Sequence, residues 1–524
     1  MTETIPSFFH SVAKEIRWNE ASLHALEPMD RTLFKTFGAG PIQSLTHKKL
    51  HHAFEHQVRQ HPNAIAVEQG FEKITYGELD NRASQLAEHM VQMGIKPGHA
   101  VGIFLQRSIN MIVGMLATLK TGACYVPQHV GIAPAEHLSH VVKVANIHLV
   151  LTEAKFQAQL PNFPNCQIIA LDKSLPEVVR ENLLPLPSGS TDRCFILFTS
   201  GTTGTPNGVQ VTHRNVCNIV LTQPGDLGVK PGTRVGQLLN IAFDMSAWEI
   251  YVCLCHGGTL LIRNKDIQKT AGAVDVIIAT PSILAKLDVE ACQQVRTVAL
   301  AGEPCPEPLA KQWSGFCQFY NCCGPTETTI VNTMQEYQGE TLSVGTPTPN
   351  NTVYVLDDQL SPLPIGEVGE MWAGGDCVTE GYLNNNELTQ ERYKPDPFLA
   401  EDKWMFRTRD LGKWNEQGEL IHLGRTDDQV KVKGFRVELT SVNNALERAE
   451  GCQQAITLKV DAKTLVSFVA PESVSVTKAR ASVEHHLPYY CVPESIIPLP
   501  RLPMTSRGKV DKNQLLKLVQ EAAQ

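Results

Sequence analysis

Short apolar runs alternate with amphipathic stretches up to residue 345 of this chain. Residues 101–105 (VGIFL) have the pattern of a buried strand, and residues 109–119 carry apolar side chains at helical spacing. Further strand-like runs lie at 148–152, 167–171, 274–279 and 297–301. Strands that alternate with helices favour a mostly parallel sheet covered on both faces. We therefore predict an α/β fold with a large N-terminal domain built on such sheets.

The pattern changes after residue 345, where Gly and Pro become frequent and strand-like runs such as 353–356 alternate with turns. This indicates a β-rich lobe that completes the large domain. The polar stretch 424–429 has the character of a hinge, and beyond it the pattern predicts a smaller, mobile α+β C-terminal domain. We predict three parts, namely a breaker-rich leader or linker at 1–45, a large core at 46–426 and a small domain at 427–524.

Composition excludes several classes of protein. With 524 residues, 42% hydrophobic and 19% charged, the chain is long enough for more than one core. No apolar run approaches the roughly 20 residues of a membrane span, and the N-terminus lacks the pattern of a secretory signal. The net charge of −8 offers no broad basic face for nucleic acid. We expect a cytoplasmic monomer that binds neither membranes nor nucleic acids.

Cysteine and histidine positions argue against a zinc centre. The fourteen cysteines are scattered and form no C-x-x-C motif, so free thiols are expected. The pairs His51-His52 and His485-His486 lack partner ligands at metal-binding spacing. We interpret both pairs as surface or hydrogen-bonded histidines.

A glycine- and threonine-rich stretch, residues 198–209 (FTSGTTGTPNGV), directly follows the apolar run 195–198. Glycine lets a backbone approach a ligand closely, and inward-facing N–H groups and hydroxyls can hold phosphate oxygens. The lysine of a Walker loop is absent from this stretch. By itself the stretch is either a phosphate loop or an ordinary threonine-rich turn.

This stretch resembles the phosphate loop of the adenylate-forming enzyme superfamily, T-S-G-[ST]-T-G-x-P-K-G. The order and spacing of the other motifs resemble the adenylation domains of nonribosomal peptide synthetases from residue 48 to residue 515, and the sequences at 300–306 and 319–324 are most similar to fungal members. Residues 1–45 resemble the segment that follows a condensation domain, a possible upstream partner. The other motifs are YGEL (76–79), LKTGACYVP (119–127), FDMS (243–246), NCCGPTE (321–327), GEM (369–371), FRTRDL (406–411), GRTDDQVK (424–431), LPYY (487–490) and GKVD (508–511).

The resemblance implies a reaction in which ATP activates a carboxylate as an acyl-adenylate with release of pyrophosphate. The acyl group then passes to the phosphopantetheine thiol of a peptidyl carrier protein. Lys509 stands at the position of the family's catalytic lysine, whose ammonium would contact the substrate carboxylate and the α-phosphate. The alternative for an isolated Gly-Lys is a solvated surface lysine.

The resemblance also implies ATP and Mg²⁺ as cofactors and assigns residues to them. Asp410 would accept the ribose hydroxyls, Glu327 would bind Mg²⁺, and Asp427 would be the hinge about which the small domain turns. The alternatives are a turn-forming Asp410 and a Glu327 that complements a helix dipole. The full ATP or AMP set is Thr199, Ser200, Gly201, Thr202, Thr203, Gly204, Asn321, Cys322, Cys323, Gly324, Thr326, Asp410 and Arg425.

Three positions depart from the family pattern. Asn207 replaces a lysine near the pyrophosphate, and Cys323 replaces an aromatic residue beside adenine. Arg409 replaces a glycine; if that position has positive φ, an arginine there costs about 1 kcal/mol or more. These departures indicate a slower enzyme or a degenerate one.

Asp244 stands where amino-acid-activating members keep an aspartate for the substrate's α-ammonium. The alternative is a helix N-cap. The predicted side-chain pocket carries no charge and much empty volume, which favours a bulky, mostly apolar amino acid; the runner-up is a bulky acylated hydroxyornithine of siderophore assembly. Its predicted lining is Met245, Trp248, Ala279, Ala299, Ala301, Cys322, Ile330 and Val331.

Two other functions compete with amino-acid activation. An acyl- or aryl-CoA ligase belongs to the same superfamily, and Asp244 argues against it. A non-catalytic adenylation module would explain Asn207 and Arg409, although the retained Lys509 and Asp410 argue against that. No carrier segment follows Lys509 before Gln524, so we expect either a stand-alone enzyme or a piece of a module.

Overall fold

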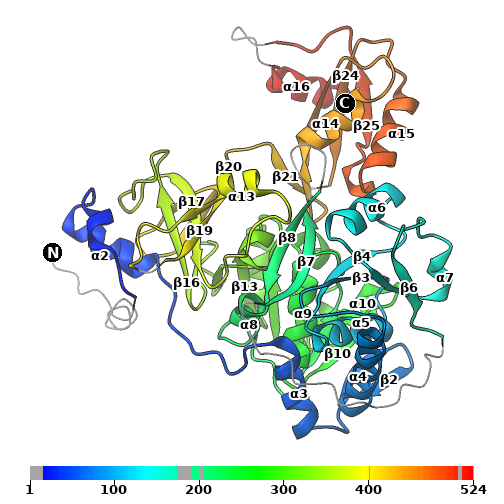
Figure 1. Ribbon diagram of the computed structural model, residues 1–524. Coiled ribbons are helices and arrows are strands. Elements are labelled where there is room, and N and C mark those ends of the chain that lie inside the picture. Colours follow the sequence, from blue (N-terminus) through cyan, green and yellow to red (C-terminus); the bar gives the residue numbers. More distant parts are fainter. Residues whose placement is uncertain are drawn as a thin grey trace.

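The computed structural model describes residues 16–173, 192–199, 206–400, 402–461, 463–504 and 510–522. Two sheets with helices between them form the lower part of the molecule in Figure 1. A β-rich part lies beside them, and the C-terminal residues form a separate lobe above. The predicted α/β class with largely parallel sheets is confirmed.

The first sheet is six-stranded and is parallel except at its β7–β8 edge. Its central strands are entirely buried, which explains their continuous apolar sequences. The predicted strands at 101–105, 148–152 and 167–171 are all present in it. In spatial order the strands are β6 (Gln167–Ala170), β5 (Leu149–Thr152), β3 (Ala100–Leu105), β4 (Cys124–His129), β7 (Arg193–Thr199) and β8 (Asn207–Thr212).

The second sheet is nine-stranded, parallel in its centre and antiparallel at both edges. Because its central strands are parallel, their carboxyl ends lie at one edge of the sheet. The order is β15 (Thr346–Pro347), β14 (Thr333–Glu336), β13 (Gln318–Cys323), β12 (Thr297–Leu300), β11 (Val276–Ala279), β9 (Arg234–Gln237), β10 (Thr259–Ile262), β1 (Ile65–Gln69) and β2 (Glu72–Thr75).

Helices fill the space between the two sheets and join them in one apolar cluster. Helix α5 contacts strands of both sheets, so its sequence is apolar on nearly every side. It begins where the Ser108 side chain accepts a hydrogen bond from the Met111 N–H, and it ends at Lys120, whose ammonium pairs with Glu55 and Asp80. The inner helices are α3 (Leu50–Gln60), α4 (Tyr76–Gln92), α5 (Ile109–Lys120), α8 (His213–Val220) and α9 (Asp244–Leu254). The remaining helices of this part are α6 (Ala135–Val144), α7 (Ala154–Gln157), α10 (Ile267–Ala271), α11 (Pro281–Leu284), η2 (Glu290–Cys292), α12 (Glu307–Ser314) and η3 (Thr326–Thr328).

A β-rich part follows, as the sequence predicts. Residues of the predicted leader pack on it, because Leu23 and Phe34 are buried against Tyr354 and Phe398. The stretch 16–45 therefore carries a short apolar face that its breaker residues obscured. The elements are η1 (Glu20–Leu23), α2 (Pro28–Phe37), β16 (Asn351–Leu356), β17 (Gly369–Gly375), α13 (Asn386–Arg392), β18 (Tyr393–Pro395), β19 (Trp404–Trp414) and β20 (Leu420–Arg425).

We call the described residues from 429 onward the small lobe and the described residues before them the large lobe. The small lobe has its own apolar clusters, whereas the exact domain boundaries stay a prediction. Within the described part of the chain, no helix is both long and apolar enough to cross a membrane. The small lobe consists of β21 (Gln429–Val432), β22 (Phe435–Glu438), α14 (Leu439–Glu447), β23 (Gln454–Lys459), β24 (Leu465–Ala470), α15 (Val476–His486), η4 (Tyr489–Cys491), β25 (Ser495–Pro498) and α16 (Lys512–Ala522).

Candidate active site

A cavity of about 600 Å³ lies between the two lobes. Its floor comes from residues at or after the carboxyl ends of β7, β9, β12 and β13, and its roof from the β21–β22 hairpin and η4. Ligands of open α/β sheets bind outside the carboxyl ends of the strands, because the loops there converge at one edge. We call this cavity the cleft.

Asp244 lines the cleft as the first residue of α9. The N-cap of this helix is Phe243, so Asp244 is not the cap residue that the alternative interpretation required. Its Oδ1 accepts a hydrogen bond from the Met245 N–H at 2.8 Å. Burial raises the pKa of Asp244, although the Thr326 side chain and the charge of Lys431 oppose the rise. The Asp244 carboxylate thus lies in the wall of the cleft with little access to water, and it would bind a cation strongly there.

Glu327 lies in η3 and is fully buried. Its Oε1 accepts a hydrogen bond from the Tyr382 hydroxyl at 2.7 Å, and its Oε2 accepts one from Arg436 Nη1 at 2.8 Å. Burial favours the neutral carboxyl, but the charges of Arg436 and Arg392 and the hydrogen bonds from Arg436 and Tyr382 together outweigh it and lower the pKa of Glu327 to about 2. Arg436 belongs to the small-lobe hairpin, so this ion pair joins the lobes across the cleft.

Asp410 lies in β19, opposite Arg425 of β20. Arg425 Nη1 donates to Asp410 Oδ1 at 2.6 Å, and the same guanidinium forms a bidentate pair with Asp427 at 2.8 and 3.0 Å. His422 Nε2 lies 3.3 Å from Asp410 Oδ1. Burial raises the pKa of Asp410, but His422 and Arg425 outweigh it and lower the pKa overall. The predicted ribose carboxylate is therefore ionised and is connected directly to the predicted hinge.

The β21–β22 hairpin brings cations into the cleft that the sequence analysis did not assign. Lys431, Lys433 and Arg436 all line the cavity. Burial lowers the pKa of Lys431, and the charges of Asp244 and Asp410 oppose this lowering without reversing it. The signal available in the sequence was the series of basic residues along 431–436, shortly after the predicted hinge. An isolated sequence does not reveal that this hairpin turns inward.

Aromatic rings hold the hairpin in place. Phe435 stacks on Tyr490 with centroids 4.1 Å apart, and it meets Phe243 edge to face at 5.0 Å. Tyr490 belongs to the LPYY motif, and Phe243 immediately precedes Asp244. Such pairs stabilise a contact by about 0.5–1.5 kcal/mol beyond the burial of their area. The lobe contact is therefore specific and not merely electrostatic.

For two of the three residues that depart from the family pattern, Arg409 and Asn207, the structure shows which side chains they contact. Arg409 has a φ of 62°, so the condition of positive φ at this position is met, and it pairs with Glu391 and, at 3.6 Å, with Asp427. Asn207 opens β8, and its Oδ1 accepts a hydrogen bond from Asn385 Nδ2 at 3.0 Å. The charge of Arg409 is thus shared between Glu391 and the predicted hinge residue Asp427.

The third departure, Cys323, ends β13 near Asp410 and Lys431. Burial raises the pKa of its thiol to about 12. Cys323 is accordingly a neutral thiol.

Two consecutive β-branched residues beside the cleft have a strained backbone. Thr329 and Ile330 have φ angles of 54° and 72°, a region that β-branched residues rarely adopt. The Thr329 hydroxyl donates to the Cys377 carbonyl at 2.7 Å, and Ile330 lines the cleft. Each such residue costs roughly 1–3 kcal/mol and persists only where the surroundings enforce it.

The predicted side-chain pocket is brought together only in part. Met245, Ala301 and Ile330 line the cleft with Asp244. Trp248, Ala299, Cys322 and Val331 are buried in the same apolar cluster but do not line the cleft. The Trp248 Nε1–H donates to the Gly225 carbonyl at 2.7 Å, which is a packing role.

Ala279 is not brought to this pocket. It belongs to the cluster on the opposite face of the nine-stranded sheet, whereas Ile278 shares a cluster with Ala299 and Met245. Side chains alternate along a strand, so an error of one residue in the sequence interpretation moves the assignment to the other face.

Further cations at the cleft were also missed. Arg107, Arg263 and Lys286 line it, so the cavity as a whole is not uncharged. Arg107 Nε donates to the Leu239 carbonyl at 2.8 Å. The same loop is held by Glu249, which is fully buried and accepts the Leu238 N–H at 2.7 Å. Burial raises the pKa of Glu249 to about 8.

Three predicted ATP contacts line the cleft, namely Thr199 at the end of β7, Gly324 and Thr326. Asn321 does not line it; its side chain donates to the Ser343 carbonyl. Lys509 and five residues of the phosphate loop lie outside the described residues; those five are Ser200, Gly201, Thr202, Thr203 and Gly204.

Comparisons with known proteins agree with this geometry. Residues 54–383 match the AMP-binding enzyme family. The chain is 41% identical to adenylate-forming reductase 06235 of Coprinopsis cinerea over 95% of its length, and it spans 49% of that relative. It is 31% identical to gramicidin S synthase 1 of Brevibacillus brevis, over 89% of this chain and 44% of that protein. In both cases the chain spans less than half of the relative.

A solved structure of a nonribosomal peptide synthetase protein with adenylation and PCP domains, bound to a vinylsulfonamide inhibitor, shares the fold. Its TM-score is 0.82 at 22% identity, with 90% of this chain and 85% of that chain covered. The chain belongs to the AMP-binding enzyme family. The predicted class, an adenylate-forming ligase related to the adenylation domains of nonribosomal peptide synthetases, is confirmed.

Proposed function

We propose that this chain activates an amino acid as its aminoacyl-adenylate, using ATP and releasing pyrophosphate, and then passes the aminoacyl group to a carrier-protein thiol. The observation that carries the proposal is Asp244, whose half-buried carboxylate lines the same cleft as Thr326 and Lys431. A substrate α-ammonium would pair with Asp244, which leaves the substrate carboxylate free to attack the α-phosphate of ATP.

The substrate side chain is a bulky and mostly apolar one. Met245, Ala301 and Ile330 form an apolar wall next to Asp244, and burial of a large side chain against them is favourable. A bulky acylated hydroxyornithine is the alternative substrate. Arg107, Arg263 and Lys286 complement the charge of phosphate groups rather than that of such side chains.

ATP would bind with its ribose hydroxyls on Asp410 and its phosphates near the phosphate loop. Glu327 is suited to Mg²⁺ as a carboxylate that is ionised at neutral pH. Both of its oxygens already accept hydrogen bonds, from Tyr382 and Arg436. Mg²⁺ would therefore bind Glu327 only when Arg436 has moved away, and it would then neutralise charge on the phosphates.

Because Arg436 and Mg²⁺ cannot both bind Glu327, we propose two arrangements of the lobes, with Asp427 as the pivot. In the present arrangement, the β21–β22 hairpin covers the cleft and Arg436 neutralises Glu327. We assign this arrangement to transfer onto the carrier. Adenylation would use the other arrangement, in which the small lobe turns and presents Lys509.

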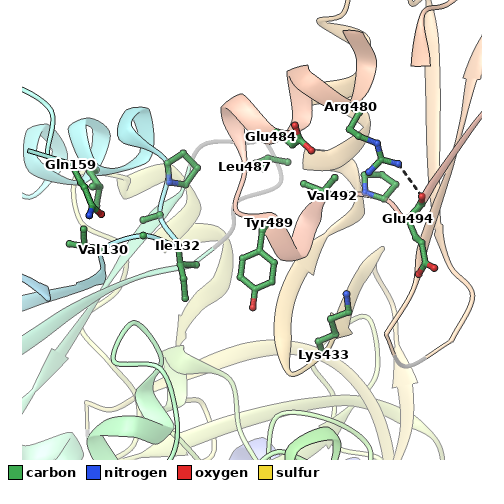
Figure 2. A pocket seen from close by; sticks show the side chains of 15 residues that line it. Val130, Ile132, Gln159, Lys433, Arg480, Glu484, Leu487, Tyr489, Val492 and Glu494 are labelled. Carbon is green, nitrogen blue, oxygen red and sulfur yellow. Dashed lines mark hydrogen bonds between the residues drawn. The ribbon is translucent and has the colours of Figure 1, made fainter. Parts of the chain in front are cut away.

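A groove at the lobe boundary supports the transfer step. Figure 2 shows it between Val130 and Ile132 of the large lobe and Leu487 and Val492 of the small lobe. Its volume is about 740 Å³. Ile132, Ala133, Lys433 and Tyr489 line both the groove and the cleft, so the two spaces adjoin. A flexible phosphopantetheine arm could enter through this groove.

Amino-acid-dependent ATP–pyrophosphate exchange tests the proposal, across the proteinogenic amino acids and hydroxamate derivatives of ornithine. A signal with one bulky amino acid is expected. Exchange that depends on fatty or aryl acids instead would favour an acyl- or aryl-CoA ligase. No exchange, with nucleotide binding intact, would favour a degenerate module.

A second candidate concerns the context of the reaction. Identity to the relative named an adenylate-forming reductase is 41%, against 31% for the gramicidin S synthase. The fate of the thioester distinguishes the two settings: a reductase setting ends in hydride transfer to the thioester, and a peptide synthetase setting ends in peptide-bond formation. Product analysis of the full-length protein with and without a nicotinamide reductant separates the two.

A further inference from the structure

Three potential metal ligands meet at the boundary between the lobes. Helix α6 of the large lobe carries Glu136, and the last turn of α15 in the small lobe carries His485 and His486. The two helices lie side by side (Figure 1). One ligand atom from each of the three side chains lies within 4.8 Å of the others. Sequence spacing alone showed no partner ligand for the pair His485-His486; the fold places Glu136 beside it from a distant part of the sequence.

The hydrogen bonds of this group suit a cation. His485 Nε2 lies 2.7 Å from Glu136 Oε1, which shows that the lobes already bring the imidazole and the carboxylate into contact. His486 Nδ1 donates to the Ser482 carbonyl at 2.7 Å. A histidine fixed in this way has its lone pair on Nε2, and such a backbone contact is the usual support of a metal-binding imidazole.

We infer that Glu136, His485 and His486 form a site for a divalent transition metal such as Zn²⁺, which joins the two lobes in the present arrangement. Two imidazoles and one carboxylate are a common ligand set for Zn²⁺, with bonds of about 2.0–2.2 Å and water in the remaining position. The side chains of Glu136 and His485 are 56% and 61% exposed, so they can move inward by the small distance that such bonds require. Their exposure also means that binding does not depend on desolvating a buried charge.

The consequence is regulatory. A cation that needs ligands from both lobes binds this arrangement and not one in which the small lobe has turned away, so it shifts the population toward this arrangement. If the proposed function holds, such a cation slows adenylation, which requires the other arrangement, while transfer onto the carrier continues. This regulatory step rests on the proposed function, whereas binding of the metal does not.

Calorimetric titration of the full chain with Zn²⁺ tests the binding. We expect one site whose affinity falls roughly tenfold or more in Glu136→Gln and in His485→Asn alike, and remains unchanged in the control His61→Asn, an exposed histidine elsewhere on the large lobe. Wild-type affinity in Glu136→Gln would overturn the inference, since the histidine pair would then bind metal alone. Equal affinity in all variants would also overturn it, by indicating adventitious binding.

Exchange assays test the regulation separately. With Mg²⁺ in excess, Zn²⁺ should inhibit ATP–pyrophosphate exchange in the wild type, and Glu136→Gln should resist that inhibition with unchanged basal exchange. Inhibition of both proteins alike would overturn the regulatory step. If the wild type shows no exchange at all, the proposed function fails, while the calorimetric result still decides whether the metal site exists.

Discussion

The ion pair between Arg436 and Glu327 offers the sharpest test of the two-arrangement proposal. Arg436→Met removes the charge and keeps a long side chain in the hairpin. The pair is 2.8 Å long, and its side chains are 11% and 1% exposed. Removing one partner of a buried pair costs roughly 3–5 kcal/mol, because the remaining charge is left uncompensated. Only the present arrangement bears this cost, since in the other one Arg436 has left Glu327.

The lower figure, about 3 kcal/mol, corresponds to about two orders of magnitude in the equilibrium between the arrangements. Transfer of an aminoacyl group from preformed adenylate to a carrier protein should therefore fall by up to about 100-fold. ATP–pyrophosphate exchange should stay the same or rise. The two half-reactions are measured separately, and Arg436→Lys serves as the matched control because it retains the charge.

Equal loss of both half-reactions in Arg436→Met would refute this reasoning, because it would indicate general damage to the fold. Undiminished transfer would refute it as well, because the ion pair would then contribute nothing to the arrangement of the lobes.

Four further predictions address individual residues. Asp244→Ala should lower the rate of exchange with the amino-acid substrate by at least roughly tenfold, as expected for loss of a charge-assisted contact, and should leave binding of its deaminated analogue unchanged in a competition assay. Equal losses for the amino acid and its analogue would exclude pairing of Asp244 with the substrate ammonium. Lys509→Ala should abolish exchange but leave transfer from preformed adenylate intact, whereas Lys512→Ala, which breaks only an exposed pair with Asp428, should preserve both. Arg409→Gly should raise the free energy of unfolding by up to about 1 kcal/mol over the wild type, because relief of the strain at positive φ outweighs the loss of a partly exposed ion pair. A marked decrease in the free energy of unfolding, measured with urea, would show that the ion pair with Asp427 contributes more than the strain costs. The pKa of Glu327 is lowered to about 2, so its ionised carboxylate stabilises the folded protein fully above the ordinary pKa of a glutamate, and this contribution is lost as the pH falls toward 2. The difference in melting temperature between the wild type and Glu327→Gln should therefore be constant from about pH 8 to about pH 5 and become smaller below pH 5.

The family resemblance of the motifs indicated part of the candidate site before the structure, and the fold gives a physical reason why these motifs lie together. Asp244 begins a helix, and Thr326 and Glu327 follow a parallel strand, β13. In a parallel sheet the ends of the strands meet at one edge, so motifs that follow strands converge even when they are far apart in the chain. The positive φ of Arg409 agrees with the glycine that the family pattern has at this position, because glycine adopts this backbone conformation without strain.

Other features could not be predicted. The assignment of Ala279 failed because strand register is set by pairing with neighbours, and the two faces of β11 pack in different clusters. The apolar face of residues 16–45 was hidden among breakers, since its partners Tyr354 and Phe398 lie in a distant part of the chain.

The sequence by itself determined the strands and the helices, because apolar periodicity and turn residues act locally, and its motifs indicated part of the chemical groups of the cleft. Only the tertiary structure decided which charges meet across the lobes. Arg436 reaches Glu327, and His485 reaches Glu136, because the two lobes lie against each other. Such contacts depend on the orientation of two separately packed cores, and no local pattern specifies that orientation.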